Sequence, residues 1–210
     1  MVLTGIVLAS ASPRRYELLR SLGLAVAVMP SGYDETDLAH LSPADLASLH
    51  ARRKLEAVTS AGLPGDLPVL AADTVVDLDG VSLGKPQDAA AAAGMLERLS
   101  GRQHLVHTAF ALALPAGGRF IEERVTTRVR FFALSRTEID EYVATGEPMD
   151  KAGAYGIQGR AAALVESIDG DFYTVMGLPL GRLIRALRRS GFALPDTKGM
   201  RPEYAPNHRS

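Results

Sequence analysis

Leu8-Ala-Ser-Ala-Ser-Pro-Arg-Arg-Tyr-Glu-Leu-Leu19 is the stretch from which the start of the fold can be deduced. It follows the apolar run 5–9, which predicts a short buried strand. Ser12 is a favoured N-cap residue and Pro13 a favoured first helical residue, so we expect a helix to begin there. Gly23 is expected to end this helix. The stretch therefore predicts a strand, a tight turn and a helix at the N-terminus.

Two arginines occupy the second and third positions of this predicted helix. Cations at a helix N-terminus oppose the macrodipole, at a cost of about 0.3–1 kcal/mol each when they are exposed. The free N–H groups of the same turn attract anions. Arg14 and Arg15 therefore suit a polyphosphate bound at this turn, and the alternative is two solvated arginines on a surface helix.

The length of 210 residues suits one α/β domain, or two lobes that share a sheet, over residues 1–195. The formal net charge of −1 gives no sign of a nucleic-acid or membrane-surface binder. The absence of cysteine excludes disulfides, a thiolate zinc site and a cysteine nucleophile. No run reaches transmembrane length, so we expect a cytoplasmic protein. The polar tail 196–210 is expected to be mobile.

The rest of the chain alternates predicted strands with predicted helices. Further strands are expected at 25–29, 69–76, 104–114, 120–134 and 163–168, and further helices at 42–60, 88–99, 135–146 and 175–190. Asp79-Gly80 predicts a hairpin, and 115–118 is expected to join the two longest strands. The loop 30–37 carries three carboxylates, Asp34, Glu35 and Asp37. This order of elements favours a mixed-sheet α/β fold.

Asp73 is the most distinctive polar residue, because apolar residues surround it in a strand expected to be buried. An ionised carboxylate there costs several kcal/mol unless a cation or a metal compensates it. It is therefore a candidate metal ligand or general base, and the alternative is a structural aspartate at a strand end.

Two lysines are weaker candidates. Lys85 lies between Gly84 and Pro86, which suits a lysine aimed at a ligand and equally suits a turn lysine in solvent. Lys54 follows Arg52 and Arg53 on a predicted helix, where a solvated face is the default interpretation.

The segment 147–159 is rich in glycine and lacks periodicity. Its glycine spacing does not fit a dinucleotide-binding fingerprint. Its glycines let the backbone approach a ligand while Tyr155 and Gln158 point inward, and a plain flexible loop is the alternative. His104 and His107 lie on opposite faces of one predicted strand and cannot share a metal, so we interpret them as structural.

Six motifs of the chain, taken together and in this order, closely resemble those of the Maf family. They are Ser10-Ala-Ser-Pro-Arg-Arg-Tyr-Glu-Leu-Leu19, Asp34-Glu-Thr36, Ala72-Asp-Thr-Val-Val76, Gly84-Lys-Pro86, Leu99-Ser-Gly-Arg102 and Glu147-Pro-Met-Asp-Lys-Ala-Gly-Ala-Tyr-Gly-Ile-Gln-Gly159. The resemblance implies an elongated mixed sheet flanked by helices, with a cleft between two lobes, similar to the inosine triphosphate pyrophosphatases. It also implies a nucleoside triphosphate pyrophosphatase that needs magnesium or manganese, is cytoplasmic and often forms a homodimer.

The resemblance also implies roles for particular residues. Asp73 resembles the proton acceptor that activates water, and Asp73 and Glu35 resemble the residues that bind the metal. The residues that resemble a triphosphate clamp are Arg14, Arg15, Lys54 and Lys85, with Ser10 a further cleft residue. The form of the last motif is similar to the branch acting on dTTP and UTP, in which Arg14, Thr74 and Gln158 occupy the specificity positions. The branch acting on 7-methyl-GTP usually carries a cysteine instead.

Two other interpretations remain open at this point. The Maf family is also associated with arrest of septum formation, so the chain could be a nucleotide-binding regulator of cell division with little turnover. Alternatively, the enzyme could act on modified pyrimidine nucleotides as a housecleaning activity.

Overall fold

The computed structural model describes residues 1–35, 40–60, 62, 65–115 and 120–196. Three sequence expectations fall wholly or partly outside these residues: the carboxylate of Asp37, most of the turn 115–118 and the tail from residue 197 onward. The described residues form one mixed α/β fold, as the sequence predicts.

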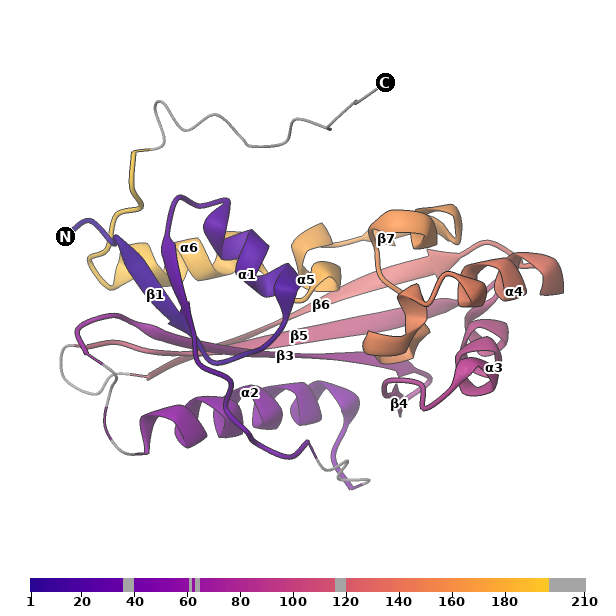
Figure 1. The fold of residues 1–210 in the computed structure, drawn as a ribbon, viewed down its shortest axis with the longest axis horizontal. Coiled ribbons are helices and arrows are strands. Elements are labelled where there is room, and N and C mark those ends of the chain that lie inside the picture. Colours follow the sequence, from indigo (N-terminus) through magenta and orange to yellow (C-terminus); the bar gives the residue numbers. More distant parts are fainter. Residues whose placement is uncertain (36–39, 61, 63–64, 116–119, 197–210) are drawn as a thin grey trace.

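The described strands form a single seven-stranded mixed sheet in the order β2-β1-β3-β5-β6-β7, with β4 paired to β3. The strands are β1 (Gly5–Leu8), β2 (Ala25–Val28), β3 (Val69–Leu78), β4 (Val81–Leu83), β5 (Gln103–Ala113), β6 (Phe120–Phe131) and β7 (Val165–Asp169). β1 pairs in parallel with β2 and β3, whereas the pairs made by β4, β5, β6 and β7 are antiparallel. The long strands β3, β5 and β6 run the length of the molecule (Figure 1).

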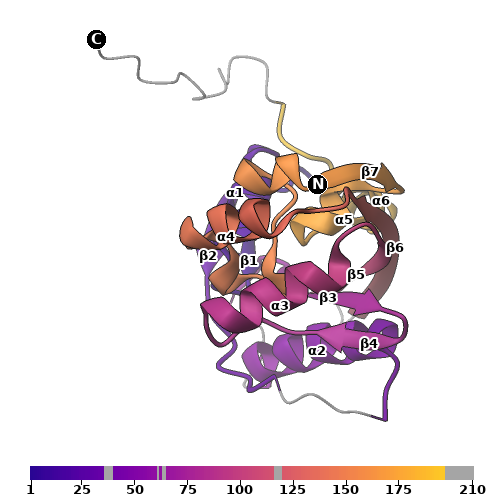
Figure 2. The same cartoon turned by 90° about the vertical axis from the view of Figure 1, so that its right-hand side faces the viewer.

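Helices cover both faces of this sheet and one of its ends. They are α1 (Pro13–Arg20), α2 (Pro43–Thr59), α3 (Ala89–Leu99), α4 (Arg136–Ala144), α5 (Phe172–Met176) and α6 (Leu180–Arg189). α2 packs on one face, and α1 and α6 pack on the other (Figure 1). Figure 2 views the molecule from the end formed by α3, α4 and β4. The two ends of the sheet therefore carry different helices and separate apolar clusters.

Local capping chemistry explains where several helices begin. The side chain of Ser12 accepts from the Arg15 N–H, and Ser42 and Asp88 cap α2 and α3 in the same way. Ser135 and Glu138 form a reciprocal capping box at α4. These four helix starts agree with the sequence predictions.

The prediction of one closing helix over 175–190 is wrong. The structure has two helices, α5 and α6, separated at residues 177–179. Gly177 ends α5 in the left-handed conformation at φ 109°, and Pro179 has no N–H with which to continue a helix. The strand predicted at 163–168 also begins later, at Val165, because residues 159–163 form a short 3₁₀ helix.

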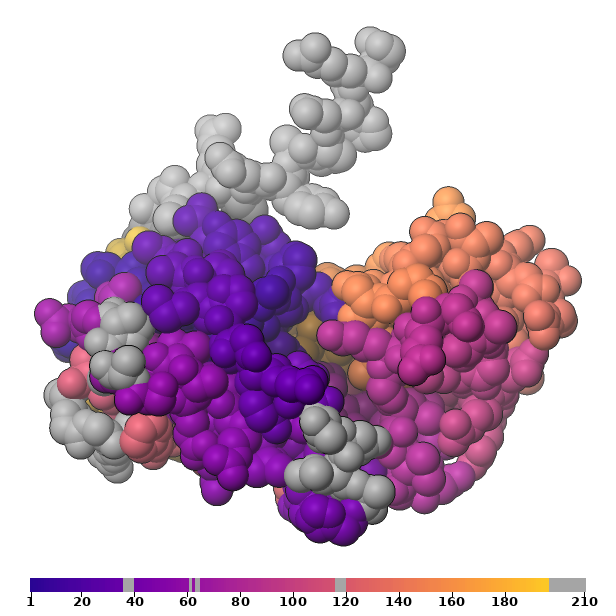
Figure 3. Space-filling model, turned by 60° about the horizontal axis from the view of Figure 1, so that its bottom comes forward, coloured from indigo at the N-terminus to yellow at the C-terminus, as the bar shows by residue number. Residues whose placement is uncertain are grey.

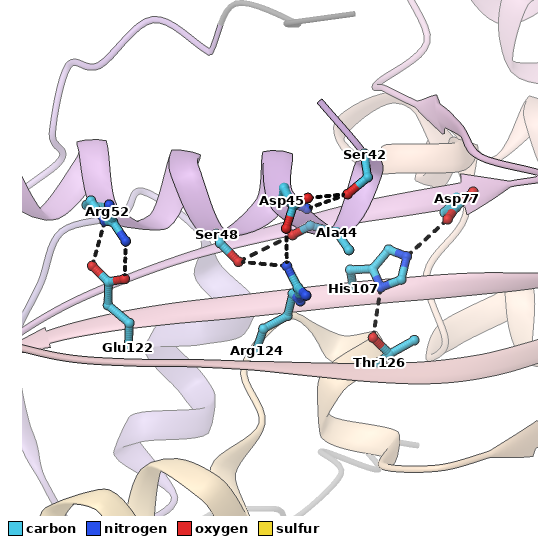
Figure 4. A network of polar contacts seen from close by, with 10 residues as sticks. All are labelled: Ser42, Ala44, Asp45, Ser48, Arg52, Asp77, His107, Glu122, Arg124 and Thr126. Atoms are coloured by element: carbon cyan, nitrogen blue, oxygen red, sulfur yellow. Dashed lines mark hydrogen bonds and ion pairs between the residues drawn. The ribbon is translucent and has the colours of Figure 1, made fainter. Parts of the chain in front are cut away.

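Ion pairs link α2 to β6 on the face of the sheet that α2 covers. Arg52 donates to both oxygens of Glu122, at 2.7 and 2.6 Å, and Arg124 donates to Asp45 at 2.8 Å (Figure 4). All four side chains are more than a third exposed, so we expect each pair to contribute little to the free energy of unfolding. Apolar residues of α2 packed on β3 and β5 hold the helix on this face, from which Lys54 reaches the sheet.

The two histidines of β5 have structural partners on opposite faces, as expected. His107 lies between Asp77, at 3.1 Å, and Thr126, at 2.8 Å (Figure 4). The Nε2 atom of His104 is 2.7 Å from the hydroxyl of Tyr155, and its ring packs edge-on against Phe131. Burial lowers the pKa of His104 to about 4.

We expect the buried His104 to make the free energy of unfolding depend on pH. Its folded pKa lies below that of an unfolded histidine, so between pH 6.5 and about 4 the unfolded chain binds the extra proton. Stability should therefore fall as the pH falls through this window, by up to about 3 kcal/mol. Urea unfolding at several pH values measures the change. His104→Gln keeps a polar group near the Tyr155 hydroxyl without a titratable ring, and it should remove this part of the dependence.

None of the helices formed by the described residues has the length and apolar character needed to cross a membrane.

Candidate active site

A cleft of about 610 Å³ lies between the two ends of the sheet, and Figure 3 shows the hollow between the indigo and violet part and the orange part of the surface. All nine site residues proposed from the sequence line it. They are Ser10, Arg14, Arg15, Glu35, Lys54, Asp73, Thr74, Lys85 and Gln158. The folding of the chain thus brings together side chains from α1, α2, β3 and four loops.

Arg15 is a buried residue of the first turn of α1, with 9% of its surface exposed. Its guanidinium donates to the carbonyl oxygen of Gly177 at 2.8 Å, to Ser10 Oγ at 3.2 Å and to Thr74 Oγ1 at 3.1 Å. Burial lowers its pKa, against the opposing effect of the charges of Asp73 and Glu35. The alternative of a solvated arginine is therefore wrong for this residue.

Lys54 joins two carboxylates at the floor of the cleft. Its Nζ atom lies 2.6 Å from Asp73 Oδ1 and 2.6 Å from Glu35 Oε1. The side chains of Lys54 and Asp73 are only 8% and 6% exposed. The expectation that Lys54 lies on a solvated helix face is wrong, because α2 presents this residue to β3 while Arg52 and Arg53 stay exposed.

The ion pair with Lys54 favours the charged form of Glu35. Burial by itself would raise the pKa of Glu35, but the hydrogen bond and the charge of Lys54, with the charges of Lys85 and His50, lower it overall. Asp73 is buried in the middle of β3, and the neighbouring ammonium of Lys54 offsets the cost of burying its carboxylate. A negatively charged pair of oxygen ligands therefore converges at one point of the cleft.

The opposite wall of the cleft adds charged residues that the sequence analysis did not select as site residues. Arg14 reaches across the cleft to Asp150 at 3.4 Å, and Lys151 donates to Asp150 and to the Glu147 carbonyl, each at 2.6 Å. Glu147, Asp150 and Lys151 belong to the motif 147–159, and their place in that motif is the sequence feature by which they could have been selected as site residues.

Glu147 holds the loop that carries Gln158. Its carboxylate accepts from the Arg160 N–H at 3.1 Å. It also lies against Gly159, where a Cβ atom would come within 2.0 Å of Glu147 Oε1 and where φ is 72°. Only glycine fits this position without displacing Glu147.

Gln158 and Tyr155 differ in how they meet the cleft. Gln158 is exposed and lines the cleft. Tyr155 also lines the cleft but is buried, and its hydroxyl is engaged with His104. Tyr155 is therefore anchored in the core of the α3–α4 end rather than free to bind a ligand through its hydroxyl.

The cleft offers two carboxylates, Glu35 and Asp73, as ligands for a divalent cation. In the described part of the chain, no group of three or more His, Cys, Asp or Glu residues could hold a metal. Glu35 and Asp73 nevertheless meet at the same cation, Lys54. Mg²⁺ is commonly bound by one or two carboxylates together with substrate phosphates and water, so this pair fits such an ion.

Comparison with known proteins agrees with this geometry. The family model described as Maf-like protein matches residues 5–190. Three bacterial proteins named dTTP/UTP pyrophosphatase are similar over most of their length. That of Symbiobacterium thermophilum is 52% identical over 90% of this chain and 95% of its own, that of Thermus thermophilus 51% over 89% and 95%, and that of Methylobacillus flagellatus 48% over 93% and 98%. The chain therefore belongs to the Maf family.

Proposed function

We propose that the protein hydrolyses dTTP and UTP between the α- and β-phosphates to give the monophosphate and pyrophosphate. The observation that carries the proposal is the convergence of Asp73, Lys54 and Glu35 in a cleft that Arg14, Arg15 and Lys85 also line. The relatives named dTTP/UTP pyrophosphatase, about half identical over nearly all of the chain, support the choice of substrate.

Asp73 is the proposed general base. Lys54 bonds its Oδ1 atom, and no other bond to this carboxylate is found among the described residues, which leaves Oδ2 to take a proton from water. The water is then deprotonated as it attacks the α-phosphorus and the pyrophosphate leaves. A positioned base of this kind contributes about 10²–10⁴-fold to a rate.

The cations of the cleft are proposed to stabilise the triphosphate and the charge that develops on the leaving pyrophosphate. Arg14, at the N-terminus of α1, and the exposed Lys85 are held by the protein less firmly than Arg15. These two side chains can therefore turn toward the triphosphate as it binds, and charged donors of this kind make strong hydrogen bonds to phosphate oxygens. Arg15 instead fixes the shape of the site through its three contacts.

We also propose that Glu35 and Asp73 hold a magnesium or manganese ion together with the substrate. The bound ion would neutralise phosphate charge and assist the ionisation of water. Lys54 bonds both carboxylates and so holds their oxygens close together before substrate binds, which is the arrangement that an oxygen-binding cation requires. Metal dependence is tested by removing divalent ions with EDTA and restoring activity with MgCl₂ or MnCl₂.

Gln158 is proposed to read the edge of the pyrimidine base. Gln158→Ala should relax discrimination between dTTP and CTP by about 10- to 10²-fold, since a base edge would then lack its polar partner. Turnover of dTTP should suffer less than in Asp73→Asn. The measurement is kcat/KM for dTTP, UTP, CTP and GTP, and an equal loss on all four would make Gln158 a scaffold residue.

The substrate proposal is tested by a panel of nucleoside triphosphates. Wild-type protein with MgCl₂ should convert dTTP and UTP to monophosphates much faster than the purine nucleotides or CTP. Including 5-methyl-UTP and pseudo-UTP compares modified pyrimidine nucleotides directly with dTTP. A preference for a purine nucleotide would contradict the proposal.

A further inference from the structure

Arg15 and Thr108 together constrain the hydroxyl of Thr74. Arg15 donates to Thr74 Oγ1 at 3.1 Å, and Thr108 Oγ1 lies 2.9 Å from the same atom. Thr74 is half-buried and lines the cleft, whereas Thr108 is completely buried and does not line it. A hydroxyl has one proton to donate and two lone pairs with which to accept, so these contacts can be counted.

The proton of Thr108 is already assigned. Thr108 Oγ1 lies 2.7 Å from the carbonyl oxygen of Thr174, which can only accept, so Thr108 donates there. In the short contact between the two threonine hydroxyls, Thr74 must then be the donor. Thr74 uses one lone pair for Arg15, which leaves a single lone pair for a ligand and no proton.

The same count of hydrogen bonds leaves the Ser10 hydroxyl as a donor toward the cleft. Its Oγ atom accepts from the Ser12 N–H at 3.2 Å and from Arg15 at 3.2 Å. Both lone pairs are then in use, and the proton is left to be donated. Ser10 thus suits an anionic oxygen, whereas Thr74 suits an N–H or O–H group.

We infer that Thr108 is a positioning residue for substrate specificity. It accepts the hydrogen bond that the Thr74 hydroxyl donates, so that Thr74 presents only an acceptor to the cleft and binds a hydrogen-bond donor of the nucleoside. This inference rests on the proposed function and deepens it. Uracil and thymine carry an N3–H donor, whereas N3 of cytosine is an acceptor. Two acceptors facing each other repel, so CTP is disfavoured by a site whose hydroxyl cannot turn its proton toward the base.

The test removes the acceptor at residue 108 without touching the cleft. In Thr108→Val the proton of Thr74 is free to turn toward the ligand, and the hydroxyl can both donate and accept. We expect the ratio of kcat/KM for dTTP to kcat/KM for CTP to fall about tenfold, through a gain on CTP. Thr108→Ser keeps the hydroxyl and should restore the wild-type ratio.

Thr127→Val is the matched control for a merely structural effect. Thr127 is also completely buried in the sheet and also holds the segment of α5, through the carbonyl and the N–H of Asp171 at 2.9 Å each. It does not line the cleft. This variant should lose stability in the same way as Thr108→Val while its dTTP to CTP ratio stays at the wild-type value.

The donor can belong to the base or to the sugar, and 2′,3′-dideoxy-TTP distinguishes them because it lacks the 3′-hydroxyl. Relaxed discrimination against CTP in Thr108→Val identifies the base, and relaxed discrimination against the dideoxynucleotide identifies the sugar. If neither ratio changes by more than twofold in a folded, active Thr108→Val protein, the inference is wrong. Failure of the proposed function is separate, because the wild-type protein would then release no pyrophosphate from dTTP.

Discussion

Asp73→Asn is expected to lower kcat for dTTP by at least about 10²-fold while the nucleotide still binds. The substitution preserves the shape of the side chain but removes the proposed base and one of the two negative charges beside Lys54. The measurement is kcat at saturating dTTP, together with calorimetric binding of a non-hydrolysable analogue.

Asp77→Asn is the control for this prediction. Asp77 is a second buried aspartate of β3, bonded to His107 and to the Gly80 N–H, and it does not line the cleft. Its replacement should change stability but leave kcat within a few-fold of wild type. Equal losses in the two variants would mean that the Asp73 effect comes from the strand and not from its chemistry.

Lys54→Met is expected to reduce the free energy of unfolding by about 3–5 kcal/mol. The cost arises because the carboxylate of Asp73 is left buried without its cationic partner. Arg53→Met, at the neighbouring position of α2, removes an exposed cation whose partner Glu56 is also exposed, and it should change stability by less than about 0.5 kcal/mol. Urea unfolding curves measure both values.

A double variant separates the charge effect from a simple packing defect. In Lys54→Met/Asp73→Asn the buried negative charge is gone, so this protein should be more stable than Lys54→Met alone. If the double variant loses the sum of the two single effects, Lys54 and Asp73 are not coupled, and the interpretation of this ion pair is wrong.

Much of the fold could be predicted because its local signals are strong. Ser12 and Pro13 locate the start of α1, and the capping box at Ser135 locates that of α4. The apolar run around Asp73 identifies β3 as a buried strand. Such signals depend only on neighbouring residues, so they can be found without knowledge of the tertiary structure.

The burial of Lys54 could not be predicted from its neighbours. Arg52, Arg53 and Lys54 are three basic residues in succession, and only the packing of α2 on β3 and β5 turns the third of them inward. The helix break at Gly177 was missed for a related reason. Periodic apolar residues continue on both sides of Gly177, so the local pattern predicts one continuous helix. The carbonyl oxygen of Gly177 instead accepts a hydrogen bond from Arg15, which is far away in the sequence.

The products formed from dTTP identify the bond that the protein cleaves. We predict that wild-type protein with MgCl₂ releases dTMP and pyrophosphate in equal amounts, with no orthophosphate while inorganic pyrophosphatase is absent. Asp73→Asn should reduce both products together. Release of orthophosphate with dTDP, and without pyrophosphate, would contradict the account.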